Sequence, residues 1–148
     1  MKSDPPFRRQ PSPDADAVLL VDDEPRALKW FSRQYGDEFR VLTASGVAQA
    51  LELLDQHAHE VAVLLTDYRM PVQDGVTLLS ATRQRFGHVS RLLMSAYADK
   101  DVAMAAVNRG HVDHILEKPL DETRTREVLR AAREACQRRL RDQALLQR

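Results

Sequence analysis

Residues 17–25 read AVLLVDDEP: five apolar residues, three acidic residues and a proline. The apolar run is continuous rather than alternating, which predicts a strand covered on both faces, as in a parallel sheet flanked by helices. Proline is favoured in the first turn of a helix, so a helix is expected to begin directly after the acidic residues. The stretch therefore predicts a strand, an acidic turn and a helix, in that order.

The same alternation of strand and helix continues along the chain. Short runs rich in Val, Leu and Ile alternate with stretches whose apolar residues recur every three or four positions. We expect strands at Val18–Val21, Phe39–Thr43, Val61–Thr66, Arg91–Met94 and Val112–Leu116. We expect helices at Arg26–Tyr35, Gly46–Asp55, Val76–Phe86 and Asp99–Arg109, and a last one from about Asp121. Five strand–helix units predict an α/β fold, in which a doubly wound five-stranded parallel sheet forms a three-layer sandwich.

The composition excludes several classes of protein. Of the 148 residues, 43% are hydrophobic, and 22 basic residues balance 22 acidic ones, so no overall charge favours binding to nucleic acid or to an anionic membrane. No apolar run approaches the roughly 18 residues that span a bilayer, and no signal region is evident. A single cysteine, Cys136, excludes an internal disulfide and a cysteine-based zinc cluster. We expect a cytoplasmic protein whose function lies in a local site.

The two ends of the chain differ from its middle. Residues 1–16 hold four of the seven prolines and one large isolated apolar residue, Phe7, so we expect a disordered tail there. At the other end, apolar residues continue at spacings of three and four through residues 134–148. This pattern predicts a helical extension that serves for dimerisation or as a linker to an output domain.

Polar residues follow four of the five expected strands. Asp22 and Asp23 follow the first, Asp67 the third, Ser95 the fourth and Lys118 the fifth. The carboxyl ends of parallel strands meet at one edge of the sheet, so these side chains should converge. Three close carboxylates repel one another unless a divalent cation lies among them, and oxygen-only ligation favours Mg²⁺, with Mn²⁺ as a substitute. Alternatively, the first two aspartates would only cap the following helix.

With a metal present, Asp67 can act as a nucleophile toward phosphorus. Lys118 would neutralise charge on the transferring group, and Ser95 would donate a hydrogen bond to a phosphoryl oxygen. The product, an acyl phosphate on Asp67, adds about two negative charges to a loop and can move neighbouring segments. The pattern therefore predicts a phosphorylation switch.

These motifs resemble those of response regulator receiver domains from two-component signal transduction, in the CheY-like superfamily. The matching residues are Asp22-Asp23-Glu24, Asp67-Tyr68-Arg69-Met70-Pro71 with Asp74-Gly75, Ser95-Ala96 and Lys118-Pro119. Each motif alone is weak, but four in order at the expected strand ends are specific. The resemblance places a receiver domain at residues 17–133 and implies the flavodoxin-like strand order 2-1-3-4-5.

The resemblance also implies roles for single residues around the metal. Asp67 would be the phosphoacceptor and, with Asp23, a direct metal ligand, whereas Asp22 would assist through water. The main-chain carbonyl of Arg69 would be a further metal ligand.

Further implied roles lie on the last two strands. Ser95 would contact the phosphoryl group, Lys118 would form a salt link with the acceptor, and the Lys118–Pro119 peptide bond would be cis. One position departs from the family: Ile115, three residues before the lysine, stands where an aromatic switch residue is usual. Tyr97, two residues after Ser95, is the candidate to take over part of that role.

The resemblance implies partners as well. A sensor histidine kinase or phosphotransfer protein would donate the phosphoryl group, an output domain or effector protein would receive the signal, and a homodimer through the last helices is a further expectation. The chain would not be an enzyme beyond phosphorylating itself from small donors and losing the phosphate again. Residues 67–71, 95–99 and 106–110 resemble receivers fused to transcription-activating ATPases, HD-type cyclic-dinucleotide phosphodiesterases or kinase modules.

Two other functions remain open. One is a scaffold receiver that acts through its C-terminal helix without phosphorylation. The other is a phosphatase of the haloacid-dehalogenase type, which would also use an aspartate nucleophile, Mg²⁺ and a lysine. That family carries an Asp-x-Asp pair after the first strand, whereas here Asp22 and Asp23 are adjacent and the lone Asp67 follows the third, so the phosphatase is disfavoured.

Overall fold

Five parallel strands form one sheet in the order β2-β1-β3-β4-β5. The computed structural model describes residues 14–101, 103–104 and 112–146. The strands are β1 (Ala17–Val21), β2 (Arg40–Ala44), β3 (Val61–Asp67), β4 (Ser90–Ser95) and β5 (His114–Glu117). Every residue of β1 and β3 is buried, as their continuous apolar runs predict. The predicted fold class and strand order are confirmed.

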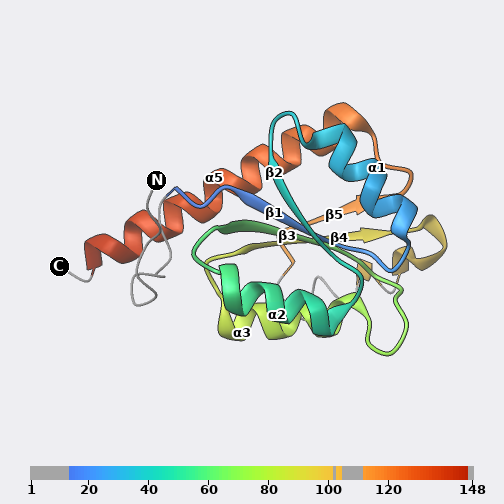
Figure 1. The fold of residues 1–148 in the computed structure, drawn as a ribbon, viewed down its shortest axis with the longest axis horizontal. Helices are drawn as coiled ribbons and strands as arrows, with labels where there is room; N and C mark the ends of the chain where they lie inside the picture. The colour runs from blue at the N-terminus through green and yellow to red at the C-terminus, as the bar shows by residue number, and fades with distance from the viewer. Residues whose placement is uncertain (1–13, 102, 105–111, 147–148) are drawn as a thin grey trace.

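Helices cover both faces of the sheet, with α1 and α5 on one side and α2 and α3 on the other (Figure 1). Their bounds are α1 (Pro25–Tyr35), α2 (Val47–His57), α3 (Gly75–Arg85) and α5 (Glu122–Leu146), and a 3-10 turn, η2, spans Tyr97–Asp99. Lys100, Asp101, Ala103 and Met104 are helical too. The rest of the helix predicted at Asp99–Arg109 lies outside the described residues.

Two strands begin later than the sequence predicts. Phe39 precedes β2 because its N–H donates to the carbonyl of Tyr35 and so closes the turn after α1. Before β5, the carboxylate of Asp113 accepts a hydrogen bond of 2.7 Å from the Arg91 N–H. The N–H of Asp113 also donates to the carbonyl of Arg91, so Asp113 contacts β4 through both its side chain and its main chain, and the strand itself begins at His114.

The alternating side chains of β1 supply two separate cores. Val18 and Leu20 belong to the cluster that includes Phe31 of α1 and Leu129 of α5. Ala17, Leu19 and Val21 belong to the cluster beneath α2 and α3. Burying a leucine side chain contributes about 1.5–3 kcal/mol, so this central strand fixes both helical layers at once. None of the helices in the described part of the chain combines the length and hydrophobicity that a bilayer-spanning helix requires.

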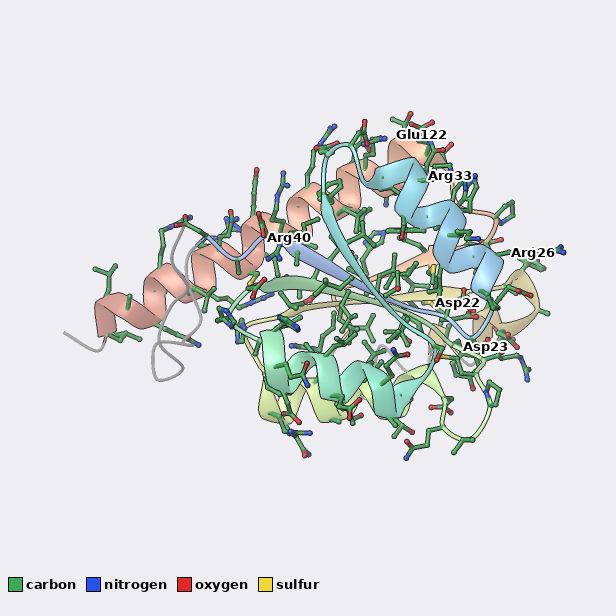
Figure 2. All side chains as sticks on the ribbon, in the orientation of Figure 1. Asp22, Asp23, Arg26, Arg33, Arg40 and Glu122 are labelled. Carbon is green, nitrogen blue, oxygen red and sulfur yellow. The ribbon has the colours of Figure 1, made fainter. Side chains whose placement is uncertain are left out.

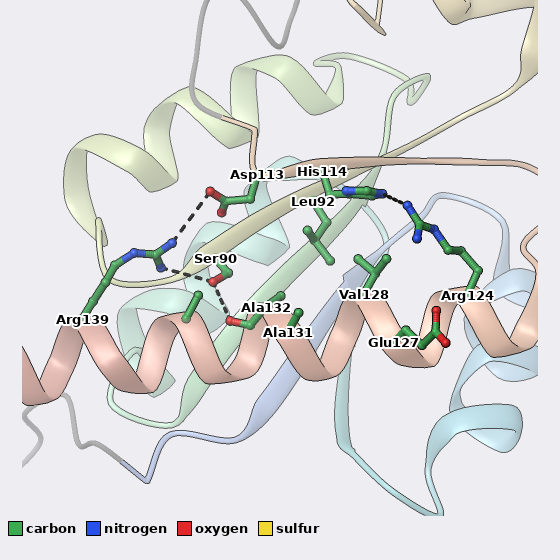
Figure 3. Close-up of a pocket in the computed structure, with 11 residues that line it drawn as sticks. Ser90, Leu92, Asp113, His114, Arg124, Glu127, Val128, Ala131, Ala132 and Arg139 are labelled. Atoms are coloured by element: carbon green, nitrogen blue, oxygen red, sulfur yellow. Dashed lines mark hydrogen bonds and ion pairs between the residues drawn. The ribbon is translucent and has the colours of Figure 1, made fainter.

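The C-terminal helix continues without a break through the predicted boundary between residues 133 and 134. Cys136 and Leu140 are buried beyond that boundary. The guanidinium of Arg139 donates to the carbonyl of His88 at 2.9 Å and to Ser90 Oγ at 3.2 Å, beside a cavity of about 340 Å³ between α5 and β4 (Figure 3). This part of α5 therefore packs against the sheet, and the large hydrophobic residues that α5 exposes are Leu145 and Leu146 at its end.

The ordered fold also begins before the predicted start at residue 17. Ala15 is buried, and its carbonyl accepts a hydrogen bond of 2.9 Å from Gln137 on α5. The N–H of Asp16 donates to the carbonyl of Glu60, next to β3. Residues 15 and 16, assigned by the sequence to the tail, are thus held by both the sheet and α5, whereas residues 1–13 lie outside the described residues.

Arginines of α5 hold the turn between α1 and β2. Arg126 Nη1 and Arg130 Nη2 each donate to the carboxylate of Glu38 at 2.9 Å. The hydrogen bond from Arg130 is the main cause that lowers the pKa of Glu38 to about 2, and burial opposes it.

We expect Glu38→Gln to lower the free energy of unfolding by about 1 kcal/mol at pH 7, because a partly exposed ion pair contributes about that much. The folded pKa lies below the unfolded value near 4.5, so this stability is present above pH 4.5 and is lost as the pH falls toward 2. Urea unfolding at pH 7 and at pH 3 measures it, with the exposed Glu52→Gln as control. If the free energies of unfolding of wild type and Glu38→Gln differed by the same amount at both pH values, the ion pairs of Glu38 would not be the source of this stability.

Candidate functional site

Three aspartates meet at the carboxyl ends of β1 and β3. One carboxylate oxygen each from Asp22, Asp23 and Asp67 lies within 4.8 Å of the other two. Asp22 and Asp67 are buried, at 3% and 8% exposed, whereas Asp23 is exposed. Figure 2 shows Asp22 and Asp23 where β1 runs toward α1. The structure thus brings together the three carboxylates that the sequence placed at separate strand ends.

The turn after β1 shows what orients Asp22. Its N–H donates to the carbonyl of Ala44, and its Oδ1 accepts a hydrogen bond of 3.0 Å from the N–H of Glu24. Glu24 is the N-cap of α1, and its side chain accepts from the Arg26 N–H. The alternative that Asp22 and Asp23 serve only as helix caps is therefore wrong, because Glu24 occupies the cap position.

Lys118 reaches this cluster from the end of β5. Its Nζ lies 2.9 Å from Asp67 Oδ1 and 3.8 Å from Asp22 Oδ2. Its main-chain N–H donates to the carbonyl of Ser95, which ties the ends of β4 and β5 together. The peptide bond between Lys118 and Pro119 is cis.

The carboxylates repel one another more than one lysine can offset. Burial raises the pKa of Asp22, and the charge of Asp67 raises it further, while the Glu24 N–H and Lys118 lower it. Three carboxylates and one ammonium leave two negative charges in the cluster. Like charges about 4 Å apart near a protein surface repel by about 4 kcal/mol, so the cluster favours occupation by a cation.

We expect Asp23→Asn to raise the free energy of unfolding by about 1 kcal/mol when divalent cations are chelated, because one repelling charge is removed. Thermal unfolding in EDTA measures the effect. Asp101→Asn is the control, since it removes an exposed negative charge outside the cluster. A less stable Asp23→Asn variant would show that the cluster is not under repulsive strain.

The loop after Asp67 is fixed by Asp74 and Gly75. Asp74 is the N-cap of α3 and accepts a hydrogen bond of 3.0 Å from the Thr77 N–H. The N–H of Gly75 donates to the carbonyl of Tyr68, and a Cβ added to the glycine would lie 2.3 Å from the main-chain oxygen of Asp67. Only glycine allows α3 to approach Asp67 this closely.

Ser95 lies at the end of β4 and is 3% exposed. Its hydroxyl donates to the carbonyl of Ala96 at 3.1 Å, so it is not directed at a carboxylate in this conformation. Rotation about one side-chain bond would release the hydroxyl, and the position at the strand end is the one the sequence predicts.

The side chain of Arg69 has a role that the sequence did not predict. Its guanidinium forms a bidentate pair with Asp99, whose carboxylate is buried at the end of η2. From the sequence, the main-chain carbonyl of Arg69 was expected to bind the metal, but neither Asp99 nor any other partner of the Arg69 side chain was predicted. The available signal was an acidic residue four positions after Ser95, but nothing in its spacing pointed to the arginine.

Of the two predicted switch residues, Tyr97 is the first residue of η2 and Ile115 lies in β5. The side chain of Tyr97 is 71% exposed, and Lys100 Nζ lies 5.9 Å from the centre of its ring. Ile115 of β5 is half-buried and lines a cavity of about 170 Å³ together with Ser95 and Met104. A switching role for either residue stays a prediction.

A third cavity, of about 330 Å³, opens beside the acidic cluster. Asp22 and Lys118 lie at its polar end, and Trp30, Phe31 and Pro119 supply much of its apolar wall. Trp30 is 47% exposed. The only tryptophan of the chain therefore lines a cavity that also contains two residues of the cluster.

Comparison with known proteins agrees with this arrangement. The chain matches the family described as the response regulator receiver domain over residues 18–130. The hydrogenase transcriptional regulatory protein HoxA of Cupriavidus necator is 36% identical over 118 residues, which are 80% of this chain and 24% of the relative. The DNA-binding transcriptional regulator NtrC of Escherichia coli is 34% identical over 106 residues, or 70% of this chain and 22% of the relative. The chain spans about a quarter of the length of these relatives.

Solved structures agree in fold. A crystal structure described as adenylate cyclase from Rhodopirellula baltica superimposes with a TM-score of 0.82 at 25% identity, over 90% of this chain and 98% of that chain. The signal receiver domain of an HD domain-containing protein from Pseudomonas fluorescens Pf-5 gives a TM-score of 0.76 at 28% identity, over 82% of this chain and 96% of that chain. The chain belongs to the response regulator receiver domain family, a family of signalling domains in two-component systems.

Proposed function

We propose that the chain accepts a phosphoryl group on Asp67 from a histidine kinase or phosphotransfer protein and thereby switches a protein–protein interaction. The observation that carries this proposal is the cluster of Asp22, Asp23 and Asp67, with Lys118 Nζ 2.9 Å from Asp67 Oδ1. A nucleophilic carboxylate, neighbouring carboxylates that can hold a metal and a cation for the transferred group are the parts that phosphoryl transfer to aspartate requires.

The donor set fits Mg²⁺, which prefers carboxylate, carbonyl and water oxygens, and Mn²⁺ would fit the same ligands. We infer that Asp23 and Asp67 would hold the ion directly, Asp22 through water, and the carbonyl of Arg69 as a further ligand. When bound, the ion would offset negative charge on the phosphoryl oxygens.

The chain's own side chains perform the transfer. One oxygen of the Asp67 carboxylate attacks the phosphorus of a phosphohistidine on the donor, and a P–O bond forms as the P–N bond breaks. The electron pair of the broken bond stays on the imidazole nitrogen, which leaves as neutral imidazole because the phosphohistidine carries a proton on its other nitrogen. Lys118 neutralises a phosphoryl oxygen, and the Ser95 hydroxyl turns from the Ala96 carbonyl to donate to another.

The acyl phosphate then changes the surface around β4 and β5. We infer that the ring of Tyr97 moves from solvent toward the cavity beside Ile115 and fills part of that cavity. The fluorescence or the NMR signals of Tyr97 would change when beryllium trifluoride, which stands in for the phosphoryl group, is added with Mg²⁺. An unchanged tyrosine environment at saturation would remove Tyr97 from the switch.

We infer that α5 carries the signal to an output domain or to a second copy of the chain, as the exposed Leu145 and Leu146 at its end favour. Molecular mass in solution, measured with and without Mg²⁺ and beryllium trifluoride, distinguishes a phosphoryl-dependent dimer from a constant monomer. A constant monomer would leave the output domain as the target of α5.

The proposed function is tested by labelling with phosphoramidate, a small phosphodonor that needs no partner protein. We expect the intact mass to rise by one phosphoryl group in Mg²⁺ and to stay unchanged in EDTA, with the label mapped to Asp67. Absence of labelling would favour the phosphorylation-independent scaffold. Release of phosphate from added phosphomonoesters over many turnovers would favour the phosphatase instead.

A further inference from the structure

An ion pair joins the loop after Asp67 to the turn after β4. Arg69 Nε donates to both carboxylate oxygens of Asp99 at 2.9 and 2.8 Å, and Nη2 donates to Oδ1 at 2.6 Å. The two residues are 30 positions apart in the chain. The side chain of Asp99 is 7% exposed, whereas that of Arg69 is 74% exposed. A buried carboxylate is thus neutralised by a guanidinium that remains in contact with water.

The cations that stabilise Asp99 belong to the phosphorylation site. The hydrogen bonds from Arg69 are the main cause that lowers the pKa of Asp99, and the charge of Lys118 lowers it as well. Lys118 is the ammonium bound to Asp67, and Arg69 follows Asp67 by two residues. Any new negative charge on Asp67 therefore competes with Asp99 for the same two cations.

A phosphoryl group is a strong competitor. It brings about two negative charges, and the planar fork of a guanidinium matches phosphate oxygens as well as carboxylate oxygens. Arg69 is free to turn because most of its side chain lies in solvent. Once Arg69 and Lys118 bind the phosphoryl group, the buried carboxylate of Asp99 has lost the cations that made its burial tolerable, which is a strongly unfavourable state.

The position of Asp99 determines what such a loss would change. Asp99 is the last residue of η2, and its N–H donates to the carbonyl of Ala96 at 2.9 Å. The same carbonyl accepts the hydroxyl of Ser95. Movement of Asp99 therefore disturbs the turn that carries Tyr97 and the hydrogen bond that keeps the Ser95 hydroxyl away from the phosphorylation site.

We propose that the pair of Arg69 and Asp99 is a latch operated by charge. Arg69 exchanges Asp99 for the phosphoryl group on Asp67, and the release of Asp99 rearranges the turn Tyr97–Asp99. Asp99 is accordingly a positioning residue: it touches no reacting atom, but it holds Arg69 away from the acceptor until the phosphoryl group arrives. The proposal rests on the proposed function, since it requires Asp67 as the acceptor.

The latch makes Asp99 and the phosphoryl group reciprocal competitors, so removing the charge of Asp99 must favour the phosphorylated conformation. Asp99→Asn keeps the side-chain shape but loses the charge. We expect it to bind beryllium trifluoride in Mg²⁺ about tenfold more tightly than wild type. Trp30 fluorescence reports binding, and Asp101→Asn, which removes an exposed charge two residues later, should bind as wild type does.

Two further measurements separate a latch from a merely structural contact. In an Arg69→Ala background, Asp99→Asn should change the affinity for beryllium trifluoride far less than in the wild-type background, because Asp99 no longer holds a guanidinium that the mimic could bind. Hydrogen exchange at the Asp99 amide should accelerate about tenfold or more when wild type binds the mimic, and should already be fast in Asp99→Asn without it. Additive effects of the two substitutions, or an Asp99 amide equally protected in both states, would overturn the latch.

The outcomes also separate the latch from the function on which it rests. A wild-type protein that binds no beryllium trifluoride in Mg²⁺ would contradict the proposed function and the latch together. If wild type binds the mimic and Asp99→Asn binds it with equal affinity, the phosphoacceptor stands and the latch alone is wrong.

Discussion

Asp67→Asn is expected to abolish labelling by phosphoramidate, with the rate falling about 10³-fold or more, the scale on which removal of a nucleophile acts. The amide of asparagine is not a nucleophile toward phosphorus, whereas the carboxylate of Asp67 is, and its Oδ1 already lies 2.9 Å from the Lys118 ammonium. Intact mass after a fixed incubation in Mg²⁺ measures the loss.

The matched control for this substitution is Asp101→Asn, which changes charge equally at an exposed position after β4. It should be labelled at the wild-type rate. Labelling of Asp67→Asn at an undiminished rate would show that a different residue accepts the phosphoryl group, and the assignment of Asp67 would then be wrong.

Gly75→Ala is expected to destabilise the protein by about 3 kcal/mol, the upper end of the cost of inserting a methyl group into a packed site. The added Cβ would lie 2.3 Å from the main-chain oxygen of Asp67, so either α3 or β3 must shift. The same shift would displace Asp67 from Asp22 and Asp23 and weaken labelling. Urea unfolding and phosphoramidate labelling measure the two effects.

Gly46→Ala is the control for this clash. Gly46 precedes α2, and a Cβ there would meet no atom within 4 Å. We expect its stability to stay within about 0.5 kcal/mol of wild type, as is usual for unstrained surface substitutions. Equal stabilities of the two glycine variants would contradict the close approach of α3 to Asp67.

The sequence was sufficient to predict the sheet and the place of the acidic cluster. The continuous apolar runs around Leu19 and Leu64 predicted buried parallel strands, and such strands end at a common edge. The convergence of the three aspartates follows from topology alone. Asp22 and Asp23 come after the end of β1, and Asp67 is the last residue of β3.

Contacts between distant residues could not be predicted in this way. The pair of Arg69 and Asp99 joins positions 30 residues apart, and Arg139 reaches Ser90 from 49 residues away. Hydrophobic periodicity predicted that the last helix continues beyond residue 133 with an apolar face, but not that the sheet covers that face at Cys136, and it carries no information on which charged side chain finds which partner. The same limit explains why the packing of residues 15 and 16 was missed.

The site also departs from what stability alone would favour. Burial and neighbouring charge raise the pKa of Asp22, and the surrounding fold holds the three carboxylates together despite their repulsion. Local strain of this kind is expected where a ligand or a new charge is to be bound.

Calorimetric titration of the protein with MgCl₂ tests most directly whether Asp22, Asp23 and Asp67 form a site for a hard divalent cation. We expect saturable uptake of one ion per chain by wild type and clearly weaker uptake by Asp23→Asn, with Asp101→Asn unchanged. Absence of uptake by wild type, or equal uptake by wild type and Asp23→Asn, would contradict it.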